Sequence, residues 1–255
     1  MNVSQAPTQV VQMFENYPRF AQPKNPDVKI WRYMDFAKFV SLLDSSSLYF
    51  ARTDKLGDDP FEGSWPRQNV RQRDYVPNGL PTEVREYFAK CQREMWETNQ
   101  EHPKFMAISC WHMNQHESAA MWKLYLKNCQ EGIALQTTYR KLQESLTNSQ
   151  ERILLGLVRY IDYETEGFDD NYLLDPFIHK RKNFEHENEV RAIVVKGNAS
   201  AEGVKIRVDL ERLIERIYVS PSAPRWFAEL TSSVANKYGY SFLVEPSRLD
   251  ESPLF

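Results

Sequence analysis

The chain has little of what marks several common protein classes. Only three of its 255 residues are cysteines, and none of them stands in a CxxC pair or a zinc-ribbon spacing. This cysteine usage leaves an odd thiol and is typical of a reducing compartment. The chain has no run of about 18 apolar residues, and its N-terminus has no basic region followed by an apolar run. We therefore expect a cytoplasmic protein with no membrane partner.

Glycine and net positive charge are also scarce. The nine glycines form neither GxGxxG nor GxxxxGK[ST], which argues against Rossmann and P-loop nucleotide sites, and no GxSxG elbow is present. The formal net charge of -3 gives no strong indication of a nucleic-acid partner. Local basic clusters are interpreted as solvated faces; they comprise Arg67, Arg71 and Arg73, and Lys180, Arg181 and Lys182.

What is present is an ordinary globular composition, with 42% hydrophobic and 26% charged residues. Strand and helix patterns occur without a strict β-α-β alternation, which predicts an α+β fold. We expect a single domain with a mixed or mainly antiparallel sheet flanked by helices. Residues 1–27 are predicted to form an N-terminal tail and residues 28–255 the globular domain. The predicted elements include a helix over 176–186 and strands over 29–33, 105–111, 153–160, 189–195 and 240–244.

The most informative segment is Glu185-His186-Glu187-Asn188-Glu189-Val190-Arg191. In an extended chain, its three glutamates share one face with Arg191, and Val190, Ala192 and Val194 fill the other face, because successive side chains alternate. A helix would instead make these charges a solvated face. The β-branched residues that follow favour the strand. Carboxylates so close together repel, and they are tolerated for chemistry or for binding a cation or hydroxyl groups. Alternatively, Arg191 neutralises a structural carboxylate.

Two further groups of residues have ordinary interpretations. His112 and His116 are four apart, but the segment around His112 is typical of a strand end and a turn, where this spacing does not create a metal site. We predict no metal ligation and interpret both as hydrogen-bonding or surface histidines. The segment Asp58-Asp59-Pro60-Phe61-Glu62 is either a second acidic site or, as we favour, a capped turn before a loop.

Six short motifs in order resemble the bacterial and phage family called domain of unknown function 2971, over about Val28 to Pro221. The motifs are Trp31-Arg32-Tyr33, Leu48-Tyr49-Phe50-Ala51-Arg52, Asp59-Pro60-Phe61-Glu62, Ser109-Cys110-Trp111-His112, Glu117-Ser118-Ala119-Ala120-Met121-Trp122, and Lys180-Arg181 through Glu187-Asn188-Glu189-Val190-Arg191. The resemblance implies a poorly characterised cytosolic protein. Some members of that family sit near mobile elements and defence genes.

The order of Arg32, Ser109 and Glu189 also resembles the ADP-ribosyltransferase fold, and Glu187 with Glu189 resembles the ExE pair of one branch. The resemblance implies that these four residues are catalytic and that NAD is the substrate. Arg32 would pair with an NAD phosphate, Ser109 would support the site floor, and Glu189 would hold a ribose hydroxyl while an oxocarbenium develops. Cofactor-binding rings would be those of Tyr33, Trp111 and Trp122, stacked on nicotinamide.

The leading hypothesis is therefore an enzyme that cleaves NAD and transfers ADP-ribose to a macromolecule, or hydrolyses the dinucleotide, with a role in bacterial defence or stress. One alternative is a non-catalytic sensor or binding module that uses the same cleft. Another is a metal-dependent nuclease or hydrolase, with a cation held by Glu187, Glu189 and either Asp59 or Glu62. The first hypothesis requires neighbouring strands for Arg32, Ser109 and Glu189, and we expect the tryptophans Trp31, Trp111 and Trp122 to surround one core or cleft.

Overall fold

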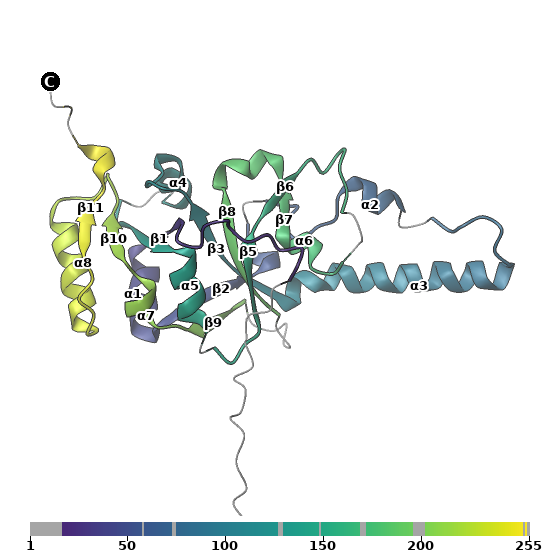
Figure 1. Ribbon diagram of the computed structural model, residues 1–255, viewed down its shortest axis with the longest axis horizontal. Helices are drawn as coiled ribbons and strands as arrows, with labels where there is room; N and C mark the ends of the chain where they lie inside the picture. The colour runs from purple at the N-terminus through teal and green to yellow at the C-terminus, as the bar shows by residue number, and fades with distance from the viewer. Residues whose placement is uncertain are drawn as a thin grey trace, which may run out of the picture.

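The computed structural model describes residues 17–57, 59–72, 75–126, 130–147, 149–168, 172–195, 202–251 and 253. Its centre is a nine-stranded sheet in which β11, β10, β4, β1, β3, β2 and β9 follow in that order, while β8 pairs with β3 and β5. These pairs are antiparallel except for β10 with β11. Helices flank the sheet (Figure 1), so the predicted α+β fold is confirmed. The strands are β1 Lys29–Asp35, β2 Ser47–Arg52, β3 Met106–Met113, β4 Gly132–Thr138, β5 Ile153–Leu157, β8 Glu189–Val195, β9 Gly203–Arg207, β10 Arg216–Val219 and β11 Val244–Pro246.

One face of the sheet carries the larger hydrophobic core. Alternation along β8 sends Val190, Ala192 and Val194 to this face, as predicted from the sequence. Four helices supply the apolar side chains that cover it: α1 Phe36–Ser45, α5 Tyr139–Leu146, α7 Leu210–Leu213 and α8 Trp226–Lys237. The side chain of Asp35 caps α1 by accepting from the backbone N–H of Lys38 at 2.8 Å. This core fixes the sheet on which the candidate site is built.

The opposite face carries two smaller cores with space between them. Trp31 and Tyr33 of β1 pack there against Trp122 of α4 (Ala119–Tyr125). Further along the sheet, Phe177 of α6 (Asp175–Ile178) packs against apolar residues of β3 and β8. Trp111 belongs to the larger core on the other face. The prediction of one core shared by the three tryptophans is therefore wrong for Trp111, because alternation along β3 turns its ring away from the other two.

The segment predicted as a helix over 176–186 is broken into three short elements. After α6, the chain forms β7 His179–Arg181 and the 3₁₀ helix η3 Lys182–Glu187. β7 pairs in parallel with β6 Arg159–Ile161 in a separate two-stranded sheet, which also divides the predicted strand over 153–160 into β5 and β6. These tertiary contacts override the local helical pattern. The predicted last strand over 240–244 is also misplaced, since β11 begins only at Val244.

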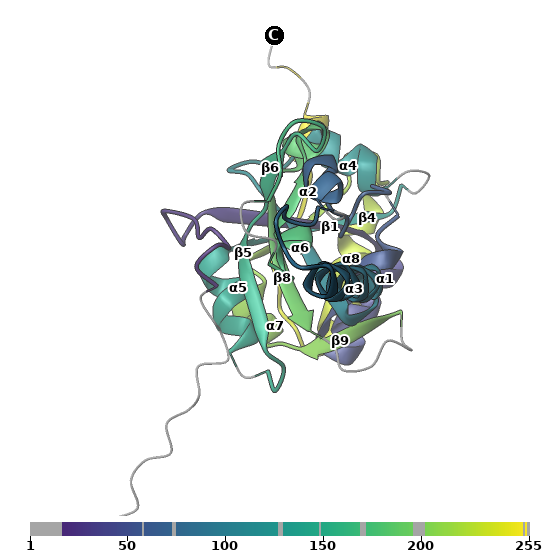
Figure 2. The same cartoon turned by 90° about the vertical axis from the view of Figure 1, so that its right-hand side faces the viewer.

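A long helix, α3 Thr82–Glu101, extends away from the sheet and is seen end-on in Figure 2. The remaining short helices are η1 Thr53–Lys55, α2 Arg67–Gln72, η2 His102–Phe105 and η4 Arg248–Asp250. Within the described ranges, no helix combines the length and the apolar character needed to cross a membrane. At the N-terminal side, the ring of Phe20 is buried in the core beside α6 and packs close to Gly156. Residues 1–16 of the predicted tail lie outside the described residues.

The edge of β3 that faces β1 and β2 is only partly paired. β8 covers the other edge along nearly the full strand. β1 pairs with His112 and Met113, whereas β2 pairs with Ala107 and Ile108. In the described pairings, Ser109–Trp111 has no strand partner on this edge. β1 and β2 therefore diverge, and side chains can occupy the space between them.

Candidate functional site

A cleft of about 550 Å³ lies at this divergence, within the size range of small-molecule sites. Its walls come from β1, β2, β3, α1 and β8 and from the segment that precedes β8. Arg32 and Tyr33 line one part, and Glu187, Glu189 and Arg191 line another. The strands that carry Arg32, Ser109 and Glu189 are neighbours in one sheet, because β3 pairs with both β1 and β8. That part of the sequence prediction is confirmed.

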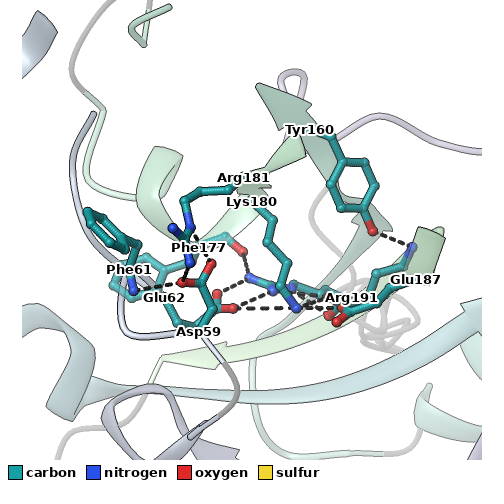
Figure 3. A network of polar contacts seen from close by, with 10 residues as sticks. Asp59, Phe61, Glu62, Tyr160, Phe177, Lys180, Arg181, Glu187 and Arg191 are labelled. Carbon is teal, nitrogen blue, oxygen red and sulfur yellow. Dashed lines mark hydrogen bonds and ion pairs between the residues drawn. The ribbon is translucent and has the colours of Figure 1, made fainter. Parts of the chain in front are cut away.

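Arg191 is the centre of a buried polar network on the β8 side (Figure 3). Its guanidinium binds Glu189 with two hydrogen bonds, at 2.6 and 3.1 Å, and Glu62 with two more, at 2.6 and 2.9 Å. A fifth bond, at 2.8 Å, reaches the carbonyl oxygen of Phe177. A guanidinium has five N–H donors, so all of them are used. Arg191 is 0% exposed and has no donor left for a ligand.

Lys180 is the second cation of this network. Its Nζ donates to Glu187 at 2.5 Å and lies 3.6 Å from Glu189 and 3.9 Å from Glu62. Lys180 and Arg191 thus face three carboxylates, those of Glu62, Glu187 and Glu189. The cluster carries one more negative than positive charge when all five groups are ionised. Such an excess suits a ligand that is positive or donates hydrogen bonds.

The pKa values of the two glutamates of the ExE pair are shifted in opposite directions. Burial would raise the pKa of Glu189, but Arg191 and Lys180 outweigh it and bring this pKa down to about 2. Burial raises the pKa of Glu187, and the charge of Lys180 only partly offsets it. The side chain of Glu187 is also 15% exposed, against 3% for Glu189. Glu189 is thus a fixed anion, whereas Glu187 has the higher proton affinity and is open to the cleft.

The backbone before β8 explains why both glutamates face the cleft. η3 ends at Glu187 and is followed by its C-cap Asn188, whose φ of 39° lies in the left-handed region that asparagine tolerates. Glu187 therefore belongs to the end of a 3₁₀ helix and Glu189 to the first position of a strand. The predicted strand alternation holds from Glu189 to Arg191 but is wrong for Glu185 and Glu187, which precede the turn.

A second ion pair closes this side of the site. Arg181 holds Asp59 with hydrogen bonds of 3.1 and 2.6 Å, and its guanidinium lies 4.4 Å from the ring centre of Phe61. Asp59 also accepts from the backbone N–H of Phe61, as in a capped turn. Glu62 of the same segment joins the Arg191 network. The segment is therefore both a turn and part of the acidic cluster, although Asp58 lies outside the described residues.

Arg32 contacts the cleft from the opposite side of β3. Its Nη1 donates to Ser109 Oγ at 2.6 Å, and its Nη2 donates to the carbonyl oxygen of Tyr49 on β2 at 2.8 Å. The guanidinium also lies 5.6 Å from the ring centre of Trp111. Among the described residues, no carboxylate lies within 4.0 Å of it, and three of its five N–H donors have no partner. Burial lowers the pKa of Arg32, so a bound anion would stabilise its charged form.

The other predicted site residues differ in burial and in their position relative to the cleft. Ser109 is buried beneath Arg32 and also accepts from Trp111 Nε1 at 3.2 Å. Trp111 and Trp122 are buried in cores on opposite faces of the sheet. Tyr33 lines the cleft, where its ring stacks with that of Tyr125 at a centroid distance of 6.2 Å. Of the three proposed stacking rings, Tyr33 is thus the one in the wall of the cleft.

The structure gives Lys180, Glu62 and His112 larger roles in the cleft than the sequence interpretation did. The interpretation of the basic run as a solvated face is wrong for Lys180, which is 7% exposed and bound by carboxylates. The basic run alone does not indicate that Lys180 lies in the short strand β7 and binds Glu187. Glu62 was favoured as part of a turn and named as an alternative cation ligand, whereas here it binds Arg191. His112 lines the same cleft. No group of three or more potential metal ligands occurs among the described side chains.

No family model matches the chain, and no curated protein matches it. A solved structure that aligns with it is that of DarT from Thermus sp. 2.9 in complex with ADP-ribosylated ssDNA. The alignment has a TM-score of 0.42 and 8% sequence identity, and it covers 91% of this chain and 99% of that chain. Membership of the 2971 family stays a prediction. A structural similarity this low does not establish an activity, which must come from the chemistry of the site.

Proposed function

We propose that the cleft binds NAD and that the protein cleaves its nicotinamide glycosidic bond, transferring ADP-ribose to a macromolecule or to water. The observation that carries this proposal is the polarity of the cleft. One wall presents Arg32 without a carboxylate partner among the described residues, and the other presents a carboxylate cluster with one excess negative charge. NAD has the matching polarity, with an anionic diphosphate and a cationic nicotinamide ring.

Arg32 is the group proposed to bind the diphosphate. A guanidinium with free N–H donors suits phosphate oxygens in charge and in geometry. Ser109 and the Tyr49 carbonyl hold it across the divergence of β1 and β2, so Ser109 acts as a positioning residue. Lys55 and Lys205 also line the cleft and add positive charge. Tyr33 offers the aromatic surface proposed to stack on the nicotinamide ring.

The carboxylates are proposed to act on the ribose. The bond between nicotinamide N1 and ribose C1 breaks with its electron pair leaving on nitrogen, which yields neutral nicotinamide and an oxocarbenium-like sugar. Glu187 and Glu189 stabilise this positive charge from fixed positions. An acceptor hydroxyl or water then forms the new bond to C1, and Glu187 takes its proton, as a carboxylate of raised pKa can. The products are nicotinamide, the ADP-ribosylated acceptor or free ADP-ribose, and the proton held by Glu187.

The two alternatives predict different ligands for the same cleft. A binding module that holds NAD without turnover needs only the opposite charges of the two cleft walls. That observation makes it the second candidate function. A metal-dependent hydrolase would need carboxylates available to a cation. Here Arg181 binds Asp59, while Lys180 and Arg191 bind Glu187, Glu189 and Glu62, so that donor set favours the first two functions. The resemblance to the 2971 family extends the proposal to bacterial defence or stress.

The test is to measure nicotinamide release from NAD with wild type and with Arg32→Met, in the presence of candidate protein and nucleic-acid acceptors. Thermal unfolding with NAD, Mg²⁺ or Mn²⁺ tests ligand binding, because a ligand that binds the native state raises the melting temperature of the protein. Release by wild type and its loss in Arg32→Met are expected. Binding of NAD without release identifies the binding module, and a shift only with a metal ion contradicts the proposal.

A further inference from the structure

His112 has a side chain that the proposed reaction does not yet use. It is 8% exposed, lies near the end of β3, and lines the cleft together with Glu187 and Glu189. Its Nδ1 lies 2.5 Å from the carbonyl oxygen of Glu187. A carbonyl oxygen only accepts hydrogen bonds, so Nδ1 carries the proton. Nε2 is then an unprotonated acceptor.

No described group pairs with this acceptor. Nε2 of His112 is buried and has no hydrogen-bond partner. Buried polar atoms are rarely left unpaired, because burial removes the hydrogen bonds that they make with water. Burial also lowers the pKa of His112, which keeps the ring neutral and the Nε2 lone pair available. A ligand that donates a hydrogen bond here would recover the lost interaction.

The surroundings of His112 indicate which donor fits. Its backbone neighbours are Trp31 on β1 and Glu189 on β8. The ring of Tyr33 lies 6.5 Å from the imidazole, between centroids, and is the aromatic wall proposed above for nicotinamide. A ligand ring stacked on Tyr33 would therefore lie near His112 and could present a substituent to it. The substituent that donates N–H groups in nicotinamide is the carboxamide.

We propose that Nε2 of His112 accepts a hydrogen bond from the nicotinamide carboxamide and selects ligands that carry an amide at this position. This inference rests on the proposed NAD site and names its specificity. A neutral imidazole beside two carboxylates offers acceptors, so it favours an amide N–H over a methyl ketone and disfavours a carboxylate. His112 is thereby a ligand-contacting specificity residue, and no proton transfer is required of it.

The experiment compares kcat/KM for NAD with that for its 3-acetylpyridine analogue, in which a methyl ketone replaces the amide. His112→Asn is the informative variant, because the asparagine amide nitrogen can retain the donor to the Glu187 carbonyl while Nε2 is lost. His116→Asn changes an exposed histidine and is the matched control. We expect the NAD-to-analogue ratio to fall about tenfold or more in His112→Asn, chiefly through KM, and to stay at the wild-type value in His116→Asn.

A second measurement needs no variant to fold. Long-range ¹H–¹⁵N spectra of wild type report the His112 tautomer and its Nε2 resonance. Nicotinamide should shift that resonance, whereas 3-acetylpyridine should leave it unchanged. An equal ratio of kcat/KM in wild type and His112→Asn, or equal shifts with both compounds, overturns the amide contact while NAD cleavage stands. A wild type that neither binds nor cleaves NAD overturns the proposed function and this inference together.

Discussion

Arg32 and Arg191 face the same cleft from strands on opposite edges of β3, and their guanidinium groups are bound in opposite ways. Arg191 uses all five N–H donors, four of them on two carboxylates. Arg32 uses two donors, on a hydroxyl and a carbonyl, and has no carboxylate partner among the described residues. The first arrangement is saturated within the protein. The second leaves charge and donors for a ligand, which is why we assign structure to Arg191 and binding to Arg32.

The largest expected effect comes from removing the saturated arginine. Arg191→Ala leaves Glu62 and Glu189 buried without their main partner, so the free energy of unfolding should fall by about 3–5 kcal/mol. Urea unfolding measures this loss. Arg140→Ala, which breaks an exposed pair with Asp27, is the control and should change stability far less. A loss below about 1 kcal/mol in Arg191→Ala would show that the network is not structural.

Glu189→Gln tests the carboxylate on the same side. It leaves Arg191 and Lys180 with less negative charge around them, and stability at pH 7 should fall by about 3 kcal/mol. The pKa of Glu189 is lowered from 4.5 to about 2, so its stabilising contribution is present above pH 4.5 and is lost as the pH falls toward 2. The stability gap between wild type and variant should therefore close over that interval.

Nicotinamide release, measured beside the unfolding curves, separates two roles of Glu189. A folded Glu189→Gln protein without turnover supports catalytic stabilisation of positive charge. Activity that falls only in step with the folded fraction would instead make Glu189 a structural ion-pair partner. Release at the wild-type rate from a stable variant contradicts the catalytic assignment.

Arg32→Met should separate binding from stability on the other side of the cleft. A half-buried cation without a carboxylate contributes little to folding, so the free energy of unfolding should change by less than about 1 kcal/mol. The loss of a phosphate contact should weaken NAD binding by about 2 kcal/mol or more, on the order of 30-fold. Calorimetric titration measures the affinity. Equal affinity for NAD in wild type and Arg32→Met would contradict the proposal that Arg32 binds the ligand while Arg191 is structural.

A small stability effect is expected for Glu187→Gln, as for Arg32→Met. Lys180 keeps Glu189 and Glu62 nearby, so the change at pH 7 should be about 1 kcal/mol or less. The pKa of Glu187 is raised above 4.5, so its contribution is present below pH 4.5 and is lost as the pH rises through the folded-state value. Relative to wild type, the variant should gain stability over that rise. A gap that changes with pH as it does for Glu189 would refute the opposite directions of the two pKa shifts.

The sequence predicted the sheet better than the site. Apolar alternation placed Val190, Ala192 and Val194 on one face and Glu189 with Arg191 on the other, because this pattern is local. The strands that carry Arg32 and Ser109 also followed from local patterns, whereas their being neighbours was an expectation of the ADP-ribosyltransferase hypothesis. Their hydrogen bond, between residues 77 positions apart, is a product of the divergence of β1 and β2, which no local pattern records.

Errors arose where tertiary contacts decide the conformation. The segment over 176–186 has helical composition, yet β6 pairs with His179–Arg181 and carboxylates bind Lys180. Trp111 was grouped with other tryptophans by residue type, although strand alternation buries it on the opposite face. Distance along the chain also hid Glu62, whose role depends on Arg191 129 residues later. These features become visible only when separate elements are packed together.

The cleft is lined by residues from early and late parts of the chain, which determines when it can form during synthesis on the ribosome. Arg32, Tyr33 and Ser109 are made early, whereas Glu187, Glu189 and Arg191 follow in β8 and the segment before it. A nascent chain that stops before η3 has the wall proposed to bind an anion but lacks Glu187, Glu189 and Arg191, and one edge of β3 is unpaired. The proposed activity is therefore withheld until the newly made β8 pairs with β3. Truncation before Glu187 would yield a chain with no complete site.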